Sequence, residues 1–266
     1  QISNWTIHAL ERAGRKEEVI PLCESEAKIT CSYNRLVKEL MTAGRHSEAE
    51  AWIAEGITVT KDKLPGIAAR LREKLLKIRT LEKDWSAVAA MQVDIFVQSP
   101  SCKTFSDCRH TALRIGLWEK VSQYLLAYLE CGILPWQQKE WPLNQSNLDL
   151  PSDNRSRQFP MLADLIEIAI MEKKPDQVLH WYNQIPEEQI GWYAVDDDAV
   201  AAAIGIYAPE QAVAIWQTKA ERLIDQVRPS AYQEAVLTGP WQKLTISWKA
   251  VRKTKISSAA AASKNW

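Results

Sequence analysis

The chain has 266 residues, 46% of them hydrophobic and 25% charged, and this composition excludes an intrinsically disordered protein. The 33 basic and 33 acidic residues cancel, so no overall field attracts nucleic acid or an anionic membrane. The sequence has no signal-peptide pattern and no uncharged apolar run near the roughly 20 residues that span a bilayer. We therefore expect a cytoplasmic protein without membrane contacts. Because the chain opens at Gln1, we expect it to be part of a longer protein.

The residue content favours helices over strands. The chain contains 12 Trp but only 9 Gly, and strand-type alternation of apolar and polar residues is hard to find. Its five cysteines are odd in number and have no repeated spacing, so we expect reduced and mostly buried thiols. The expected fold class is all-α.

Tryptophan recurs at a fixed period. Trp52, Trp85 and Trp118 stand 33 residues apart, and each follows a short break in an apolar helical pattern. This period is typical of stacked helical hairpins, because one hairpin cannot cover its own apolar face and shares it with the next. We expect the three indoles to be core residues between hairpins, and not platforms for ligands.

The first two hairpins share a turn sequence. Ala13-Gly14-Arg15 and Ala43-Gly44-Arg45 lie 30 residues apart, each before a charged segment. Ser32 is a natural N-cap for a helix over 33–41. The helix that follows the second turn is expected to end near Gly56, since glycine is a frequent C-terminal stop.

Four further hairpins follow in chain order. Their paired helices are predicted over 65–78 and 85–95, 101–115 and 118–129, 162–170 and 178–182, and 200–204 and 212–216. Only the interval between the fourth and fifth hairpins exceeds the period, and an inserted loop over 132–158 accounts for the excess. The predicted fold is a right-handed α-solenoid of about six helical hairpins over residues 1–235, similar to a tetratricopeptide superhelix.

The inserted loop 132–158 contains three prolines, which prevent a long helix. Loops longer than about 12 to 15 residues are usually functional or disordered. Trp136 and Trp141 lie in this loop, where the repeat requires no large aromatic residue. They either pin the loop onto the helices or form a partner-binding hot spot together with Arg155 and Arg157.

The C-terminal segment, residues 236–266, is basic. No acidic residue follows Glu234, and an apolar face recurs at helical spacing. A basic amphipathic helix can lie on nucleic acid or a membrane, but a terminal repeat also needs a polar outer face as a cap. We expect a cap followed by a frayed tail. The basic residues of this segment are Lys243, Lys249, Arg252, Lys253, Lys255 and Lys264.

Catalytic signatures are not found in the sequence. Every glycine is isolated, which excludes a P-loop or dinucleotide-binding loop, and the four histidines are scattered without metalloprotease spacing. Cys102, Cys108 and His110 come closest to a metal cluster but have no fourth ligand nearby, so we interpret them as helix-packing residues. Asp196-Asp197-Asp198 is interpreted as a helix N-terminus in preference to a cation site. We expect no catalytic residues, metal ligands or cofactors.

A series of short motifs extends over most of residues 30–220. They are Tyr33 to Gly56, Pro65-Gly66-Ile67-Ala68, Asp84-Trp85, Trp118, Trp141-Pro142-Leu143, Phe159-Pro160 and Glu172-Lys173-Lys174-Pro175-Asp176. Through these motifs the chain resembles the C-terminal helical region of bacterial SWIM zinc-finger proteins. In that family a separate N-terminal segment carries Cys-x-Cys and Cys-x-His zinc ligands, which implies contact with nucleic acid or protein. Cys-x-Cys is absent here, so the resemblance implies no metal ligand in this chain.

Two functions of different classes remain open. The sequence favours a non-enzymatic scaffold that binds an unknown protein partner through its helical repeats. The alternative is a nucleic-acid-associated module that uses the basic C-terminal segment together with a zinc finger on a missing segment. An enzyme with a site in a groove has no support from any motif.

Overall fold

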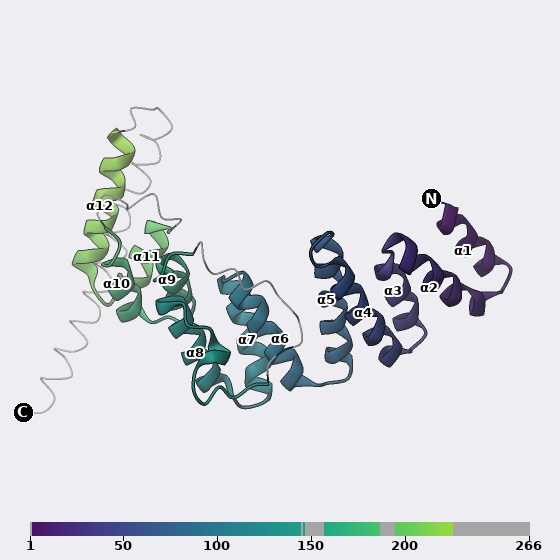
Figure 1. Cartoon of the computed structure of the whole chain (residues 1–266). Helices are drawn as coiled ribbons and strands as arrows, with labels where there is room; N and C mark the ends of the chain where they lie inside the picture. Colours follow the sequence, from purple (N-terminus) through teal and green to yellow (C-terminus); the bar gives the residue numbers. More distant parts are fainter. Residues whose placement is uncertain (1, 145, 147–156, 187–194, 226–266) are drawn as a thin grey trace, which may run out of the picture. The chain divides into compact units, whose positions relative to one another are not determined.

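The computed structural model of the chain describes residues 2–144, 146, 157–186 and 195–225 (Figure 1). Within these residues all regular structure is helical, with twelve α-helices, two short 3₁₀ helices and no strand, which confirms the all-α class. The helices are α1 Ile2–Arg12, α2 Val19–Thr30, α3 Tyr33–Thr42, α4 His46–Thr60, α5 Pro65–Leu81, α6 Trp85–Gln98, α7 Cys102–Arg114, α8 Trp118–Cys131, α9 Leu162–Met171, α10 Pro175–Tyr182, α11 Asp197–Ile204 and α12 Pro209–Asp225, with η1 Lys16–Glu18 and η2 Pro135–Gln137.

The two Ala-Gly-Arg turns are alike at atomic level. Gly14 and Gly44 have φ of +75° and +74°, a left-handed conformation that glycine adopts at little cost. In both turns the arginine after the glycine pairs with the glutamate three residues later, Arg15 with Glu18 and Arg45 with Glu48. The predicted repeat is therefore confirmed for these two turns.

One backbone hydrogen bond recurs at five of the described helix ends. In each, a residue with positive φ ends the helix, and the amide of the next residue donates to the carbonyl five positions earlier, at N···O distances of 2.9 to 3.0 Å. Three of these helix ends, at Lys83, Gly116 and Lys173, lie at the breaks predicted within the third, fourth and fifth hairpins. The five bonds run from Arg15 to Leu10, from Arg45 to Leu40, from Asp84 to Arg79, from Leu117 to Ala112 and from Lys174 to Ala169.

Gly56 corrects one predicted boundary. The helix expected to end there continues to Thr60, and Gly56 lies buried inside α4. A Cβ at this position would lie 2.7 Å from Leu71 Cδ1 of α5 and 2.9 Å from Tyr33 Cγ of α3. The glycine thus lets α3 and α5 approach the α4 backbone closely, and it does not stop the helix.

The described residues group into two compact units, the first comprising 2–95, 108–118 and 142–146 and the second comprising 96–107, 119–141 and 157–225. In the first unit, α2 packs on α3, α3 on α4 and α4 on α5. Tyr33, Leu36, Val37 and Leu40 of α3 lie on one helical face and are at most 2% exposed. They form the centre of the unit's apolar core.

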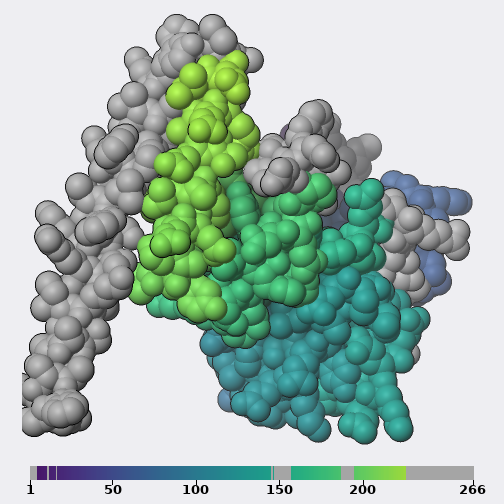
Figure 2. All heavy atoms as spheres, turned by 90° about the vertical axis from the view of Figure 1, so that its left-hand side faces the viewer, coloured from purple at the N-terminus to yellow at the C-terminus, as the bar shows by residue number. Residues whose placement is uncertain are grey.

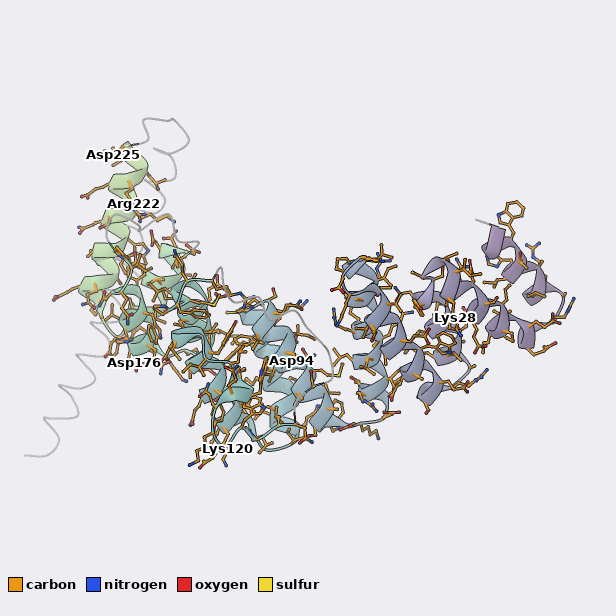
Figure 3. The ribbon with its side chains drawn as sticks, in the orientation of Figure 1. Lys28, Asp94, Lys120, Asp176, Arg222 and Asp225 are labelled. Carbon is orange, nitrogen blue, oxygen red and sulfur yellow. The ribbon has the colours of Figure 1, made fainter. Side chains whose placement is uncertain are left out.

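The three periodic tryptophans all belong to the first unit and are only half-buried. Each ring has a cation over it, with Lys28 Nζ at 5.4 Å from the Trp52 centroid, Arg109 Cζ at 5.9 Å from Trp118 and Arg114 Cζ at 4.2 Å from Trp85. Figure 3 labels Lys28, which belongs to α2. The prediction of core indoles was therefore too strong, because these rings combine apolar packing with a cation–π contact at the surface.

In the second unit, α9 to α12 share one apolar core, and a buried polar network joins α10, α11 and α12. The Tyr182 hydroxyl donates to Asp197 Oδ1 at 2.8 Å, and the Arg222 guanidinium pairs with Asp197 Oδ2. Asp196 accepts from the Asp198 amide at 3.0 Å as the N-cap of α11, which confirms the predicted helix N-terminus. Figure 2 shows α12, in light green, at the surface of this unit.

All five cysteines are free thiols, as expected, but only Cys23 and Cys108 are buried. Cys31 and Cys102 are half-buried and Cys131 is exposed. The expectation of mostly buried thiols was therefore wrong in part.

The close packing at Gly56 predicts the effect of a single methyl group. Gly56→Ala is expected to lower the free energy of unfolding by about 1 to 3 kcal/mol, because the new Cβ overlaps Leu71 and Tyr33. The matched control is Gly66→Ala in the exposed first turn of α5, where nothing lies within 4 Å of the added Cβ. This control is expected to raise stability by roughly 0.5 kcal/mol through helix propensity. Urea denaturation followed by circular dichroism measures both, and equal effects of the two variants would contradict the packing described.

Candidate functional site

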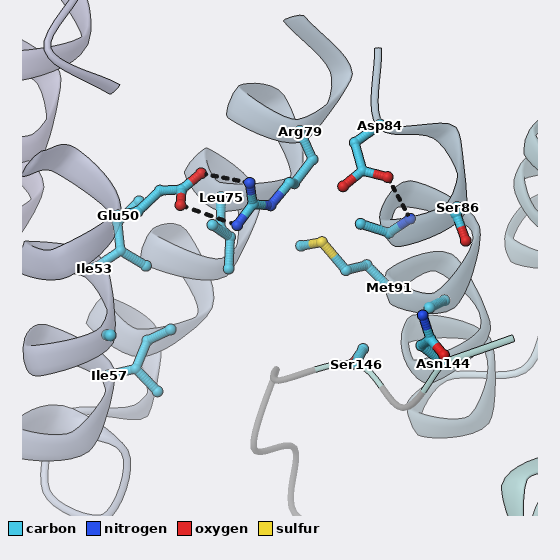
Figure 4. Close-up of a pocket in the computed structure, with 13 residues that line it drawn as sticks. Glu50, Ile53, Ile57, Leu75, Arg79, Asp84, Ser86, Met91, Asn144 and Ser146 are labelled. Carbon is cyan, nitrogen blue, oxygen red and sulfur yellow. Dashed lines mark hydrogen bonds and ion pairs between the residues drawn. The ribbon is translucent and has the colours of Figure 1, made fainter. Parts of the chain in front are cut away.

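A pocket of about 430 Å³ lies in the first unit, between α4, α5, α6 and the segment that contains Asn144 and Ser146 (Figure 4). Its lining residues come from four segments, so the pocket depends on the packing of consecutive helices. They are Glu50, Ile53, Ala54 and Ile57 of α4, Leu75 and Arg79 of α5, Asp84 before α6, Ser86, Ala87, Ala90 and Met91 of α6, and Asn144 and Ser146.

The inner wall of the pocket is aliphatic. Ile53 and Ile57 of α4 face the pocket beside Leu75 of α5, and Met91 reaches in from α6 (Figure 4). Ile53, Ile57 and Met91 are at most 5% exposed, so their packing fixes the shape of this wall. Such a wall accepts an apolar side chain, because burial of apolar area is favourable without any directional bond.

The charged groups at the rim are paired with one another. Arg79 Nη2 donates to Glu50 Oε2 at 2.9 Å, and Arg79 Nη1 lies 2.9 Å from Glu50 Oε1 without forming a hydrogen bond, so an ion pair with one hydrogen bond joins α5 to α4. Arg79 Nη1 also donates to Glu82 Oε2 at 2.9 Å. These contacts hold α4 and α5 together and occupy the guanidinium.

Asp84 has a structural role at the same rim. Its Oδ1 accepts a hydrogen bond from the Ala87 amide at 3.1 Å, so it caps the N-terminus of α6. Figure 4 shows this carboxylate turned toward the start of α6, beside Ser86. A carboxylate that accepts a capping bond is stabilised by the helix dipole as well.

The arrangement is suited to recognition. The described lining includes no histidine or cysteine, and its acidic and basic groups are engaged in the ion pairs and the cap. What the pocket offers is an aliphatic wall with a hydrogen-bonding rim.

Two lining residues come from the predicted inserted loop. Asn144 and Ser146 lie within 132–158, the segment between α8 and α9 that the repeat period marked as extra. Sequence reasoning flagged this loop but selected tryptophan and arginine inside it by residue type. Position in the loop was the only available signal for Asn144 and Ser146.

Among the loop residues considered for partner binding, the structure describes Trp136, Trp141 and Arg157, and all three lie in the second unit. Trp136 is half-buried in η2, next to the buried Pro135. Trp141 is also half-buried, and its ring meets Tyr124 edge-on with centroids 5.3 Å apart. Both indoles are therefore partly covered, and Trp141 contacts α8 through Tyr124. Arg155 lies outside the described residues.

Arg157 is half-buried and makes its hydrogen bonds within the second unit. Its guanidinium donates to the carbonyls of Val97 and Gln98, beside the C-terminal end of α6, and to the Tyr128 hydroxyl at 2.5 Å. The Tyr128 ring in turn packs edge-on against Phe159, 5.7 Å between centroids. Arg157 therefore links the loop to the C-terminal end of α6 and to α8.

The residues named for nucleic-acid contact all fall outside the described residues, so this alternative stays a prediction. They are Lys243, Lys249, Arg252, Lys253 and Lys255.

In the described part of the chain, no group of three or more histidine, cysteine or acidic side chains is placed to hold a metal ion. Cys102 lies beside Glu167, and burial raises the pKa of its thiol to about 11, with further contributions from Glu167 and Asp164. A thiol with a raised pKa is a poor nucleophile and a poor metal ligand near neutral pH.

No protein-family model, curated protein or solved structure matches the chain. The family suggested by the sequence motifs therefore stays a prediction. In the part of the chain that the structure describes, no helix combines the length and apolar character required to cross a bilayer.

The hydrogen bonds of Arg157 predict that removal of this side chain lowers the stability of the protein. Arg157→Ala is expected to lower the free energy of unfolding by about 2 kcal/mol, because two carbonyls and a hydroxyl lose a charged donor. The control is Gln158→Ala at the exposed neighbouring position, with a change within about 0.5 kcal/mol. Urea denaturation measures both. A fully stable Arg157→Ala variant would return this side chain to the partner-binding role considered from the sequence.

Asp94 of α6 predicts a pH dependence of stability (Figure 3). Burial raises the pKa of this carboxyl from 3.8 to about 7, so the folded state keeps a proton that the unfolded state releases near pH 4. Its contribution to stability is present below about pH 4 and is lost as pH rises through 7. Asp94→Asn is therefore expected to raise the free energy of unfolding at pH 8 by roughly 2 kcal/mol, after allowance for solvent screening, and to change it little at pH 4.

Denaturation of Asp94→Asn and of the unchanged protein at several pH values tests this expectation. The control is Asp62→Asn, which alters an exposed carboxylate in the turn between α4 and α5. Equal pH profiles for the unchanged protein and Asp94→Asn would show that this carboxylate ionises freely in the folded state.

Proposed function

We propose that the chain is a non-enzymatic scaffold that binds a protein partner through the surface of its helical hairpins. The observation that carries the proposal is the pocket of about 430 Å³ between α4, α5 and α6, which has an aliphatic wall and whose charges are paired internally. Interfaces gain most of their binding energy from a few apolar or aromatic anchors that enter such pockets. An aliphatic anchor of the partner, surrounded by hydrogen bonds to Ser86 and Asn144, fits this chemistry.

The repeated turn geometry supports a stacked architecture. Five helix ends close with the same backbone hydrogen bond, and α2 to α5 and α9 to α12 each pack in chain order within their unit. We propose a right-handed α-solenoid of about six hairpins on this basis. Arrays of this kind present extended surfaces to partners and need no reactive group.

The motifs shared with SWIM zinc-finger proteins extend the proposal. If the full protein carries a zinc-binding segment, the helical region would bring a protein partner to whatever that segment contacts. The internal pairing of Arg79 with Glu50 and Glu82 is compatible with this division of labour, because it leaves shape as the main determinant at the pocket.

The proposal predicts that filling the pocket blocks partner binding. Ala54→Arg places a long side chain in the pocket from an exposed position of α4, so the core residues remain in place. Affinity capture from a lysate of the organism that encodes the chain, quantified by mass spectrometry, should lose the specific partner at least tenfold. The matched control is Ala51→Arg, one turn earlier at an exposed position that does not line the pocket.

Circular dichroism of both variants establishes that they fold. Equal recovery of every captured protein by Ala54→Arg and Ala51→Arg would remove the pocket from the proposal. Failure of the unchanged protein to capture any partner would count against the scaffold function itself.

A further inference from the structure

The second unit has a groove that the sequence did not indicate. A hollow of about 870 Å³ lies between α9, the start of α10 and α11, with Ile170, Ala199, Ala202 and Ala203 in its wall. A smaller hollow of about 250 Å³ lies farther along α9, toward the N-terminus of α11. Both hollows include Ile170 and Ala199, so they adjoin and form one groove between the two helices.

The wall contributed by α11 is made of small side chains. Ala199, Ala202 and Ala203 recur at helical spacing on the groove side, while Val200 and Ile204 of the same helix are buried in the unit's core. Alanines at these positions leave room for the backbone of another segment to approach closely. The volume is sufficient for several aliphatic side chains, because the hollow is much larger than one side chain.

Exposed apolar residues follow α11 at one end of this groove. Ile206 is 80% exposed and Tyr207 is 58% exposed, and both line the larger hollow. Large apolar side chains gathered at the mouth of a groove are typical of a surface that is covered in a complex. Their position next to the alanine wall extends the apolar surface beyond α11.

The groove has opposite charges at its two ends. Lys173 is exposed at the turn between α9 and α10, and Lys174 beside it pairs with Glu172 at 2.6 Å. Glu167 is exposed at the other end, near Asp196. Glu167 lies inside α9 and Lys173 lies in the left-handed turn after it, so the two charges mark opposite ends of the groove. A bound segment with complementary charges must therefore carry a basic group at one end and an acidic group at the other.

We propose that this groove binds an amphipathic helix of a partner protein. Aliphatic side chains of that helix fill the space over Ala199, Ala202 and Ala203, a basic residue at one end pairs with Glu167, and an acidic residue at the other end pairs with Lys173. The inference rests on the proposed scaffold function and assigns the partner's chemistry at a second site.

A displayed library of helical peptides, selected against the immobilised full chain, tests the assignment. Enriched peptides should share an aliphatic stripe with a basic residue toward one end and an acidic residue toward the other. Ala202→Glu inserts a charge at an exposed position of the groove and should weaken the binding of these peptides at least tenfold. The control is Ala214→Glu, at an exposed position of α12 outside the groove.

Charge reversal gives the decisive comparison. Selection against the double variant Glu167→Lys, Lys173→Glu should enrich peptides with the two charges exchanged. Peptides that bind Ala202→Glu as well as the unchanged chain, or that keep their charge order with the double variant, would overturn the inference. The scaffold function would then still stand or fall with the Ala54→Arg capture experiment, because that pocket belongs to the first unit.

Other occupants give distinct results. If peptides are enriched only after Trp241→Asp and Trp248→Asp, the chain's own C-terminal segment competes for the groove and the assignment to an external helix is wrong. Dimerisation that Ala202→Glu abolishes would assign the groove to a second copy and overturn the inference in the same way. A selection with no enriched peptide from the unchanged chain would also reject it.

Discussion

The hairpins of this chain depend on one backbone arrangement, in which a left-handed residue lets the next amide reach the carbonyl five positions earlier. At five described helix ends this bond satisfies a carbonyl that the helix leaves without a partner, and it reverses the chain toward the next helix. The direction of the second helix follows from the turn, and the facing apolar stripes follow from the direction. The turn at Gly44 sets α3 beside α4, so that Tyr33 packs against Gly56.

Local features of the sequence were sufficient for the fold class and for the positions of most turns between the described helices. Apolar periodicity identifies a helix from its own residues, and the Ala-Gly-Arg turns repeat in sequence as they do in space. Gly56 was misinterpreted because a glycine at a helix end and a glycine under a crossing helix look the same in sequence. The distinction lies with Tyr33 and Leu71, which are 23 and 15 residues away.

The burial of side chains and their tertiary partners could not be predicted from the sequence for the same reason. The 33-residue period of tryptophan indicates which face each indole occupies, but the half-burial depends on Lys28, Arg109 and Arg114, which reach the rings from other helices. Arg157 was selected for its charge in a loop, while its carbonyl partners lie about 60 residues earlier in the chain. Asn144 and Ser146 carry no distinctive chemistry, and only the packing of α4, α5 and α6 gives them a role.

The pocket of the first unit and the groove of the second unit differ in whether their charged groups are paired, and this difference affects which partners each can select. The pocket of the first unit neutralises its charges internally, so discrimination there depends on the shape of an apolar anchor. The groove between α9 and α11 keeps Lys173 and Glu167 exposed at opposite ends, so it can also distinguish the orientation of a bound segment. Shape and polarity together provide more specificity than either one.

Lysine occupies the left-handed position at two of the five turns, Lys83 and Lys173, where the others have glycine. A survey that counts hairpins by glycine spacing would overlook both boundaries and would merge α5 with α6 and α9 with α10 into single long elements. Related chains are therefore better recognised by the polar break between two apolar helical stripes than by any one residue type. This makes the repeat easy to miss in sequence searches even where the backbone geometry is the same.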